Sequence, residues 1–300
     1  MCILICRHLA KKIAWLVCLS LSFVMAVPSS ASADLRLKLS GGRGYLMMDG
    51  VNQILQDWRT YEKKDSDNLP NWTFIGEEGI SFHDSLDLEG ELLWFLTRNL
   101  ALGLGGGWIH GKLSGEDNEL RQAYDDGFGN VLVTFSYIRP NEARAVPLTL
   151  SAYLFFRITG RLSLFMRGGG GVLWAEVNDR EGYRDVELDT YDYEWQQMAS
   201  GWGRILHGGL GMAVEIERGL SLFIEGNVRQ GGVRGLDGEN FEKEKGTLYY
   251  FEEYHQHIDF WKSEHRVLSQ PPDGENMRNI REAEIDLDGF SVRIGLIVRL

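Results

Sequence analysis

Two short histidine motifs contain the residue types of this 300-residue sequence that could perform chemistry. The stretch 83–85 places His83 two residues before Ser85, so both side chains fall on one face of an extended strand. A serine becomes nucleophilic when such a base is within hydrogen-bond distance. The stretch 254–257 contains His255 and His257 among glutamates, a set of donors that suits a transition metal. Each motif also has a simpler interpretation, as a polar strand end and as an acidic loop with solvated histidines.

The composition excludes several other kinds of site. The formal net charge is −12, which argues against a nucleic-acid partner because phosphate backbones require a basic surface. All three cysteines, Cys2, Cys6 and Cys18, precede residue 34, so the rest of the chain has no thiolate. The four glycines at 168–171 open no helix and therefore form no phosphate loop. We predict no catalytic residue, no metal ligand and no cofactor.

The first 33 residues differ from the remainder. Basic Arg7, Lys11 and Lys12 precede an apolar run at 13–27, and Ala31 and Ala33 form a small-residue cleavage site. The run is shorter than the ~20 residues of a spanning helix. We predict a signal peptide at 1–33, cleaved after Ala33 on export through the Sec pathway, and a single domain at 34–300. The alternative is an N-terminal membrane anchor.

The elements that must position any site are strands. The chain ends GFSVRIGLIVRL, in which apolar residues alternate with Ser291, Arg293 and Arg299. Eight segments show this period of two: 35–39, 86–96, 100–108, 147–157, 161–174, 206–216, 220–230 and 290–300. Short turns at 97–99, 158–160 and 217–219 alternate with long connections at 49–78, 114–146, 178–200 and 232–286. We predict an all-β, eight-stranded antiparallel up-and-down barrel with its turns at one end and its loops at the other.

The two faces of these strands favour a membrane barrel over a soluble one. The polar face is mostly glycine, alanine and serine interrupted by single charges, as in a narrow interior. The apolar face is rich in leucine, with Trp94, Trp108 and Trp174 near strand ends, where aromatic girdles lie. A charge facing lipid at mid-bilayer costs about 2–4 kcal/mol. We therefore predict an interior ionic network made by Glu89, Glu91, Arg167, Glu215, Glu225, Arg229, Arg293 and Arg299.

The chain resembles the bacterial eight-stranded outer-membrane barrels of the OmpA/OmpX/OmpW-like superfamily. RIGLIVRL resembles their C-terminal assembly signal through Arg293, Gly295, Val298 and Leu300, although Leu300 stands where the family usually has phenylalanine. TRNLALGLGGGW and VPLTLSAYLFF resemble turn and strand segments of OmpW-like proteins. The resemblance implies the outer membrane of a Gram-negative cell, periplasmic turns and extracellular loops. Its implied partners are outer-membrane lipid and lipopolysaccharide, the barrel assembly machinery and periplasmic chaperones.

Three functions remain open. We expect a non-enzymatic structural or surface-interaction protein that meets an extracellular ligand through its acidic loops. The second possibility is a porin-like channel for small solutes or hydrophobic molecules, as in OmpW-like proteins. The third is a lipid A hydrolase, because His83 and Ser85 resemble the histidine–serine pair of the lipid A deacylases. Leu86 replaces the asparagine usual there, and strand parity turns both side chains inward, away from lipid.

Overall fold

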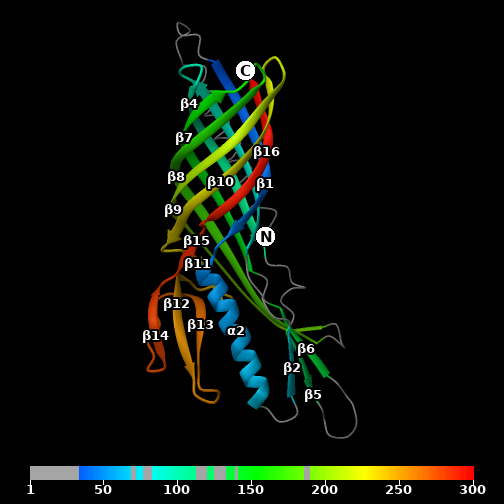
Figure 1. Cartoon of the computed structure of the whole chain (residues 1–300). Coiled ribbons are helices and arrows are strands. Elements are labelled where there is room, and N and C mark those ends of the chain that lie inside the picture. The colour runs from blue at the N-terminus through cyan, green and yellow to red at the C-terminus, as the bar shows by residue number, and fades with distance from the viewer. Residues whose placement is uncertain are drawn as a thin grey trace. The chain divides into compact units, whose positions relative to one another are not determined.

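Eight antiparallel strands pair in chain order, and the last pairs with the first to close a ring (Figure 1). The computed structural model describes residues 34–68, 72–76, 83–112, 120–124, 133–138, 141–185 and 190–300; the predicted signal peptide lies outside them. The ring strands are β1 (Asp34–Leu46), β3 (Asp84–Phe95), β4 (Leu100–Lys112), β7 (Asn141–Arg157), β8 (Leu162–Asp185), β9 (Thr190–Glu217), β10 (Leu220–Arg234) and β16 (Gly289–Arg299). The β1–β16 ladder runs from Arg36 opposite Arg299 to Leu46 opposite Gly289 and leaves no free edge in the ring.

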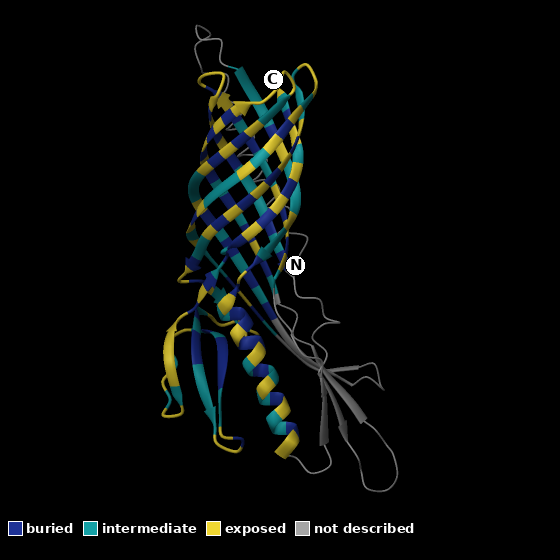
Figure 2. Ribbon diagram, in the orientation of Figure 1, coloured by how far each residue is buried: buried dark blue, intermediate teal, exposed yellow. Residues whose placement is uncertain are grey.

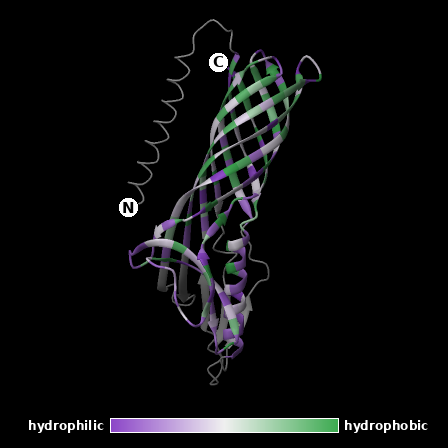
Figure 3. Cartoon of the chain, turned by 90° about the vertical axis from the view of Figure 1, so that its left-hand side faces the viewer, coloured by the Kyte–Doolittle hydropathy of each residue, from purple (hydrophilic) through white to green (hydrophobic). Residues whose placement is uncertain are grey.

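Along the strands of the ring, exposed side chains alternate with buried ones, in step with the alternation of apolar and polar residues in the sequence (Figure 2). In β16, Ile294 is 66% exposed whereas its neighbour Arg293 is 4% exposed. The exposed members form what we term the apolar belt, the outward-facing Leu, Ile, Val, Met, Phe and Trp side chains of the eight strands. Figure 3 shows the hydrophobic residues concentrated on the ring strands.

The three short turns lie at one end of the ring, together with the C-terminal end of β16 (Figure 1). In two of them a threonine hydroxyl accepts a backbone N–H, from Leu100 to Thr97 and from Leu162 to Thr159, at 3.0 Å in each case. In the third, Gly219 adopts a φ of 88°, which a side chain would disfavour. The four long connections therefore meet at the opposite end.

The long connections contain regular secondary structure, which the sequence pattern did not predict. The connection 49–78 contains α2 (Asp49–Asn68) and β2 (Trp72–Gly76), and 114–146 contains β5 (Leu120–Tyr124) and β6 (Val133–Ile138). The connection 178–200 mostly continues β8 and β9, which stay paired as far as Asp185 opposite Thr190. The last one contains β11 (Asp237–Glu239), β12 (Lys245–His255), β13 (Phe260–Leu268), β14 (Met277–Glu282) and β15 (Glu284–Asp286).

Two apolar clusters fill the ends of the ring. Near the short turns, aromatic residues including Phe155, Phe165 and Phe223 pack together. At the other end, Val51, Ile54 and Leu55 of α2 pack with inward-facing residues of the strands. Their spacing puts them on one helix face, so α2 covers this mouth of the ring. None of the helices in the described part of the chain has the length and apolar character needed to cross a membrane.

Candidate functional site

Charged side chains from five strands meet in the middle of the ring. We term this group the ionic cluster: Lys38 of β1, Glu89 and Glu91 of β3, Arg167 of β8, Glu225 of β10 and Arg293 of β16. The cluster has three cations and three carboxylates, so its formal charges balance. It brings together five of the eight residues predicted for the network and adds Lys38.

Lys38 is the most heavily contacted member. Its Nζ lies 2.6 Å from Glu225 Oε2 and 3.3 Å from Glu89 Oε1, and it donates to the Tyr153 hydroxyl at 3.0 Å. Its side chain is 1% exposed. The ammonium also lies 5.0 Å from the centroid of the Phe223 ring, within cation–π range, so it connects the ionic cluster to the aromatic cluster beside it.

The two guanidiniums complete the network. Arg167 donates to Glu89 Oε1 at 2.6 Å and to Asn227 Oδ1 at 3.0 Å. Arg293 donates to Glu89 Oε2 at 2.6 Å and to Glu225 Oε1 at 3.2 Å. Glu89 therefore accepts from both arginines, which suits a carboxylate enclosed by cations.

Glycines make room for these long side chains. A Cβ at Gly103 would overlap Glu91 Oε1, and one at Gly209 would lie 2.9 Å from Glu225 Oε1. The small residues on the polar strand faces thus provide the space that the carboxylates occupy. Bulky side chains at these positions would displace the ionic cluster.

Arg229 forms a separate buried pair. Its Nη1 donates to Asp87 Oδ2, and its Nε donates to the Leu287 carbonyl at 3.2 Å. Asp87 was not among the predicted network residues, although it lies on the same strand face as Glu89. The interior therefore has two ionic centres at different depths.

Glu215 and Arg299 lie outside both centres, in contrast to the predicted network. Glu215 is next to the turn at 217–219 and accepts the Gly219 N–H at 3.4 Å. Arg299 is exposed, and its backbone N–H donates to the Gly219 carbonyl at 2.7 Å. Both residues have the predicted parity, but they lie at strand ends, where the interior opens to solvent.

His83 and Ser85 do not form a pair. His83 stacks on Tyr45 with ring centroids 4.2 Å apart, and its Nδ1 donates to the Leu46 carbonyl at 2.9 Å. Its Nε2 is then left to accept from the Tyr45 hydroxyl at 3.1 Å. Ser85 is buried inside the ring and donates to Asp87 Oδ1 at 3.1 Å. The expectation that both point inward was wrong, because His83 precedes β3 and stacks on the outward-facing Tyr45.

A second serine–histidine contact lies in the interior. Ser151 Oγ and His207 Nε2 are 3.1 Å apart across Gly169, whose missing side chain leaves the space between them. Ser151 is buried among strand side chains. This contact fits a structural hydrogen bond in a packed interior.

His255 and His257 lie along the contact between α2 and the β12–β13 hairpin. Asp57, Tyr61 and Asp65 share one helix face; Asp57 accepts from Ser263 at 2.5 Å and Asp65 Oδ1 lies 3.0 Å from His257 Nε2. Tyr61 packs edge-on to His255 with centroids 4.6 Å apart. Because α2 runs along β13, it covers an edge of this sheet.

Burial shifts the titration of the aromatic groups here. It raises the pKa of Tyr61 to about 12, assisted by the negative charge of Asp65. It lowers the pKa of His255 below its ordinary value. Within the described residues, no three His, Cys, Asp or Glu side chains are placed to hold a metal ion.

The residues of the predicted assembly signal lie on the seam between β16 and its neighbours. Arg293 belongs to the ionic cluster, and a Cβ at Gly295 would overlap the Leu39 carbonyl oxygen. Val298 lies opposite Leu37 on one side and Leu220 on the other. Leu300 is exposed. Recognition of these residues during assembly stays a prediction.

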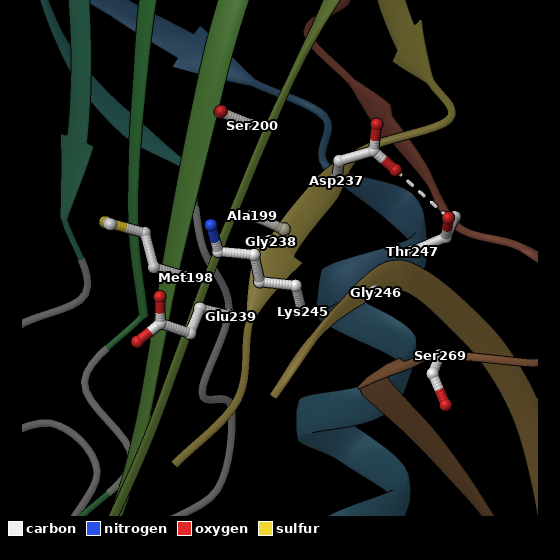
Figure 4. Close-up of a pocket in the computed structure, with 10 residues that line it drawn as sticks. All are labelled: Met198, Ala199, Ser200, Asp237, Gly238, Glu239, Lys245, Gly246, Thr247 and Ser269. Carbon is white, nitrogen blue, oxygen red and sulfur yellow. Dashed lines mark hydrogen bonds between the residues drawn. The ribbon is translucent and has the colours of Figure 1, made fainter. Parts of the chain in front are cut away.

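A sizeable pocket lies beyond the apolar belt, where β11 is paired between β9 and β12 (Figure 4). It has a volume of about 560 Å³. Its polar lining includes Ser200, Asp237, Glu239, Lys245 and Thr247. Thr247 donates to Asp237 Oδ1 at 3.0 Å. Sequence alternation marked these residues only as part of a long connection.

Comparison with known proteins shows similarity only at the level of solved structures. No family model and no curated protein matches the sequence. A major outer membrane protein from Thermus thermophilus aligns over 89% of this chain and 99% of its own, with 14% identity and a TM-score of 0.36. The outer membrane protease OmpT from Escherichia coli aligns over 91% and 99%, with 8% identity and a TM-score of 0.41.

Proposed function

We propose that this chain is a bacterial outer-membrane β-barrel with a closed interior, and that its role is structural or surface-interacting rather than enzymatic. The ring of eight strands would be the transmembrane part. The short turns would face the periplasm, and α2 and the β12–β14 sheet would lie outside the cell.

The apolar belt supports a membrane location. Side chains such as Leu150, Leu210 and Ile294 point away from the ring and are more than 60% exposed. A continuous exposed band of this kind would promote aggregation in water and is stable against hydrocarbon. Closure of the ring also satisfies the backbone hydrogen bonds that lipid cannot.

The packed interior is the observation that best supports a closed barrel. From the short turns outward, the ring holds the aromatic cluster, the ionic cluster, the Asp87–Arg229 pair and the apolar cluster under α2. The charged groups are bonded to one another and therefore are not available to line a water column. Eight strands leave an interior that side chains can fill completely.

The two alternatives receive less support. A channel for small polar solutes needs a continuous polar path, and the aromatic cluster and the apolar cluster under α2 interrupt any such path along the axis. A lipid A hydrolase of this kind needs its serine nucleophile within hydrogen-bond distance of its histidine base. Ser85 lies inside the ring, whereas His83 packs on the outward-facing Tyr45, so the two side chains do not meet. Lipopolysaccharide, an extracellular ligand, the assembly machinery and periplasmic chaperones stay proposed partners.

Planar-bilayer recording tests the closed interior. The purified full chain, inserted in a neutral bilayer, should give no steady conductance at any voltage below membrane breakdown. Folding of the protein used for insertion is checked separately by the heat-dependent shift in gel mobility that a closed barrel shows in detergent. A stable unitary current from protein that passes this check would refute the closed interior.

A further inference from the structure

Arg204 is an outward-facing arginine at the margin of the apolar belt. It lies on β9 between Leu206 and Trp202, which are 62% and 65% exposed, and it is exposed itself. Across the ladder it faces Val172 of β8, and Trp202 faces Trp174. Arg204 therefore lies beside a pair of tryptophans, the residues that mark the membrane–water interface.

The positive charge of Arg204 has no counterion within the described residues. It makes no ion pair or hydrogen bond through its side chain with any of them. The carboxylate of Glu284, on the neighbouring outer surface, forms an ion pair with Arg234, with 2.8 Å between Arg234 Nη2 and Glu284 Oε2. Asp286 is two strands away, about 10 Å in a sheet, opposite Gly232. The Arg204 guanidinium is thus unpaired among the residues that the structure describes, and a guanidinium binds phosphate through paired N–H donors.

The pocket of about 560 Å³ continues this surface away from the belt. Met198 and Ser200, which line it, have the same outward parity on β9 as Trp202 and Arg204. Ser200 is four residues from Arg204, a span of about 13 Å. Hydroxyls and carboxylates of the lining are suited to sugar hydroxyl groups, and Lys245 supplies a second positive charge.

We propose that Arg204, Trp202 and this pocket bind the phosphorylated sugar headgroup of a glycolipid in the outer leaflet. Arg204 holds a phosphate, the indole of Trp202 contacts the junction between headgroup and acyl chains, and the sugar lies in the pocket. The inference depends on the proposed function, because only a membrane barrel places this strip at a lipid surface.

Native mass spectrometry of the intact protein released from detergent micelles measures the binding. The probes are a diphosphorylated glucosamine-disaccharide lipid, its dephosphorylated form, phosphatidic acid and inorganic phosphate. The wild-type protein should bind the diphosphorylated glycolipid about tenfold more tightly than the dephosphorylated form, and Arg204→Gln should remove that factor. Arg218→Gln, at an exposed arginine in a short turn, is the matched control and should change nothing.

A substitution in the pocket separates the sugar from the phosphate. Ser200→Phe should weaken binding of the glycolipid and leave binding of phosphatidic acid unchanged, because only the glycolipid needs the pocket. Equal losses in Arg204→Gln and Arg218→Gln would overturn the proposal, as would inorganic phosphate that competes as well as the glycolipid. Solubility of the chain without detergent would instead refute the membrane barrel itself.

Discussion

Removal of the Lys38 ammonium is the most informative perturbation of the interior. Lys38→Met keeps most of the side-chain volume but leaves Glu89, Glu91 and Glu225 with only two guanidiniums. The Lys38 Nζ contacts that disappear include Glu225 Oε2 at 2.6 Å and the Tyr153 hydroxyl at 3.0 Å. Loss of one partner of a buried ionic group typically costs about 3–5 kcal/mol.

Equilibrium unfolding in urea, with the protein reconstituted in lipid vesicles, measures this loss of unfolding free energy. Lys63→Met, at an exposed lysine of α2, is the matched control and should change stability by less than about 0.5 kcal/mol. Adding Glu225→Gln to Lys38→Met restores the charge balance and should recover part of the lost stability. If Lys38→Met were no more destabilising than Lys63→Met, the ionic cluster would not stabilise the fold.

Two further predictions concern other parts of the structure. Gly171→Ala should destabilise the fold by about 1–3 kcal/mol, because the added Cβ would overlap the Leu148 carbonyl oxygen. Gly168→Ala is the control and should be neutral in the same unfolding assay, because no atom lies within 4 Å of its added Cβ. His255 has a lowered pKa, so the unfolded segment binds its proton more readily and packing against Tyr61 should weaken as pH falls below about 6.5. Limited proteolysis at 245–268 should therefore be faster at pH 5 than at pH 7.5, and His255→Asn should flatten this difference; an unchanged pH dependence would exclude His255 as its cause.

Sequence alternation predicted the side of the ring on which most strand residues lie, with His83 as an exception just before β3, but it did not predict their depth. It placed the polar faces of β3, β10 and β16 inward, as found for Glu91, Glu225 and Arg293. It did not distinguish Glu215 and Arg299, which have the same parity at strand ends. Depth depends on the stagger between neighbouring strands, which a single strand does not encode. For the same reason the sequence did not indicate that Lys38 and Asp87 have buried partners.

The helix α2 was missed for a different reason. Val51, Ile54, Leu55 and Trp58 have the i, i+3, i+4, i+7 spacing of an amphipathic helix, so the signal was present in the sequence. It lay inside a segment that the strand pattern marked as a long connection. The pairing of β8 and β9 as far as Asp185 and Thr190 could not be predicted in this way, because those residues lack a clear period of two.

The chain positions of the ionic cluster have a consequence for the order of assembly. Before the first and last strands meet, the strands from β3 to β10 carry Glu89, Glu91 and Glu225 against Arg167 alone, an excess of two negative charges. Lys38 lies on β1 and Arg293 lies on β16, and these first and last strands of the ring pair with each other. Pairing of β1 with β16 therefore brings the formal charges of the ionic cluster into balance. Pairing of β1 with β16 should therefore be favoured by electrostatic attraction within the ionic cluster as well as by backbone hydrogen bonds.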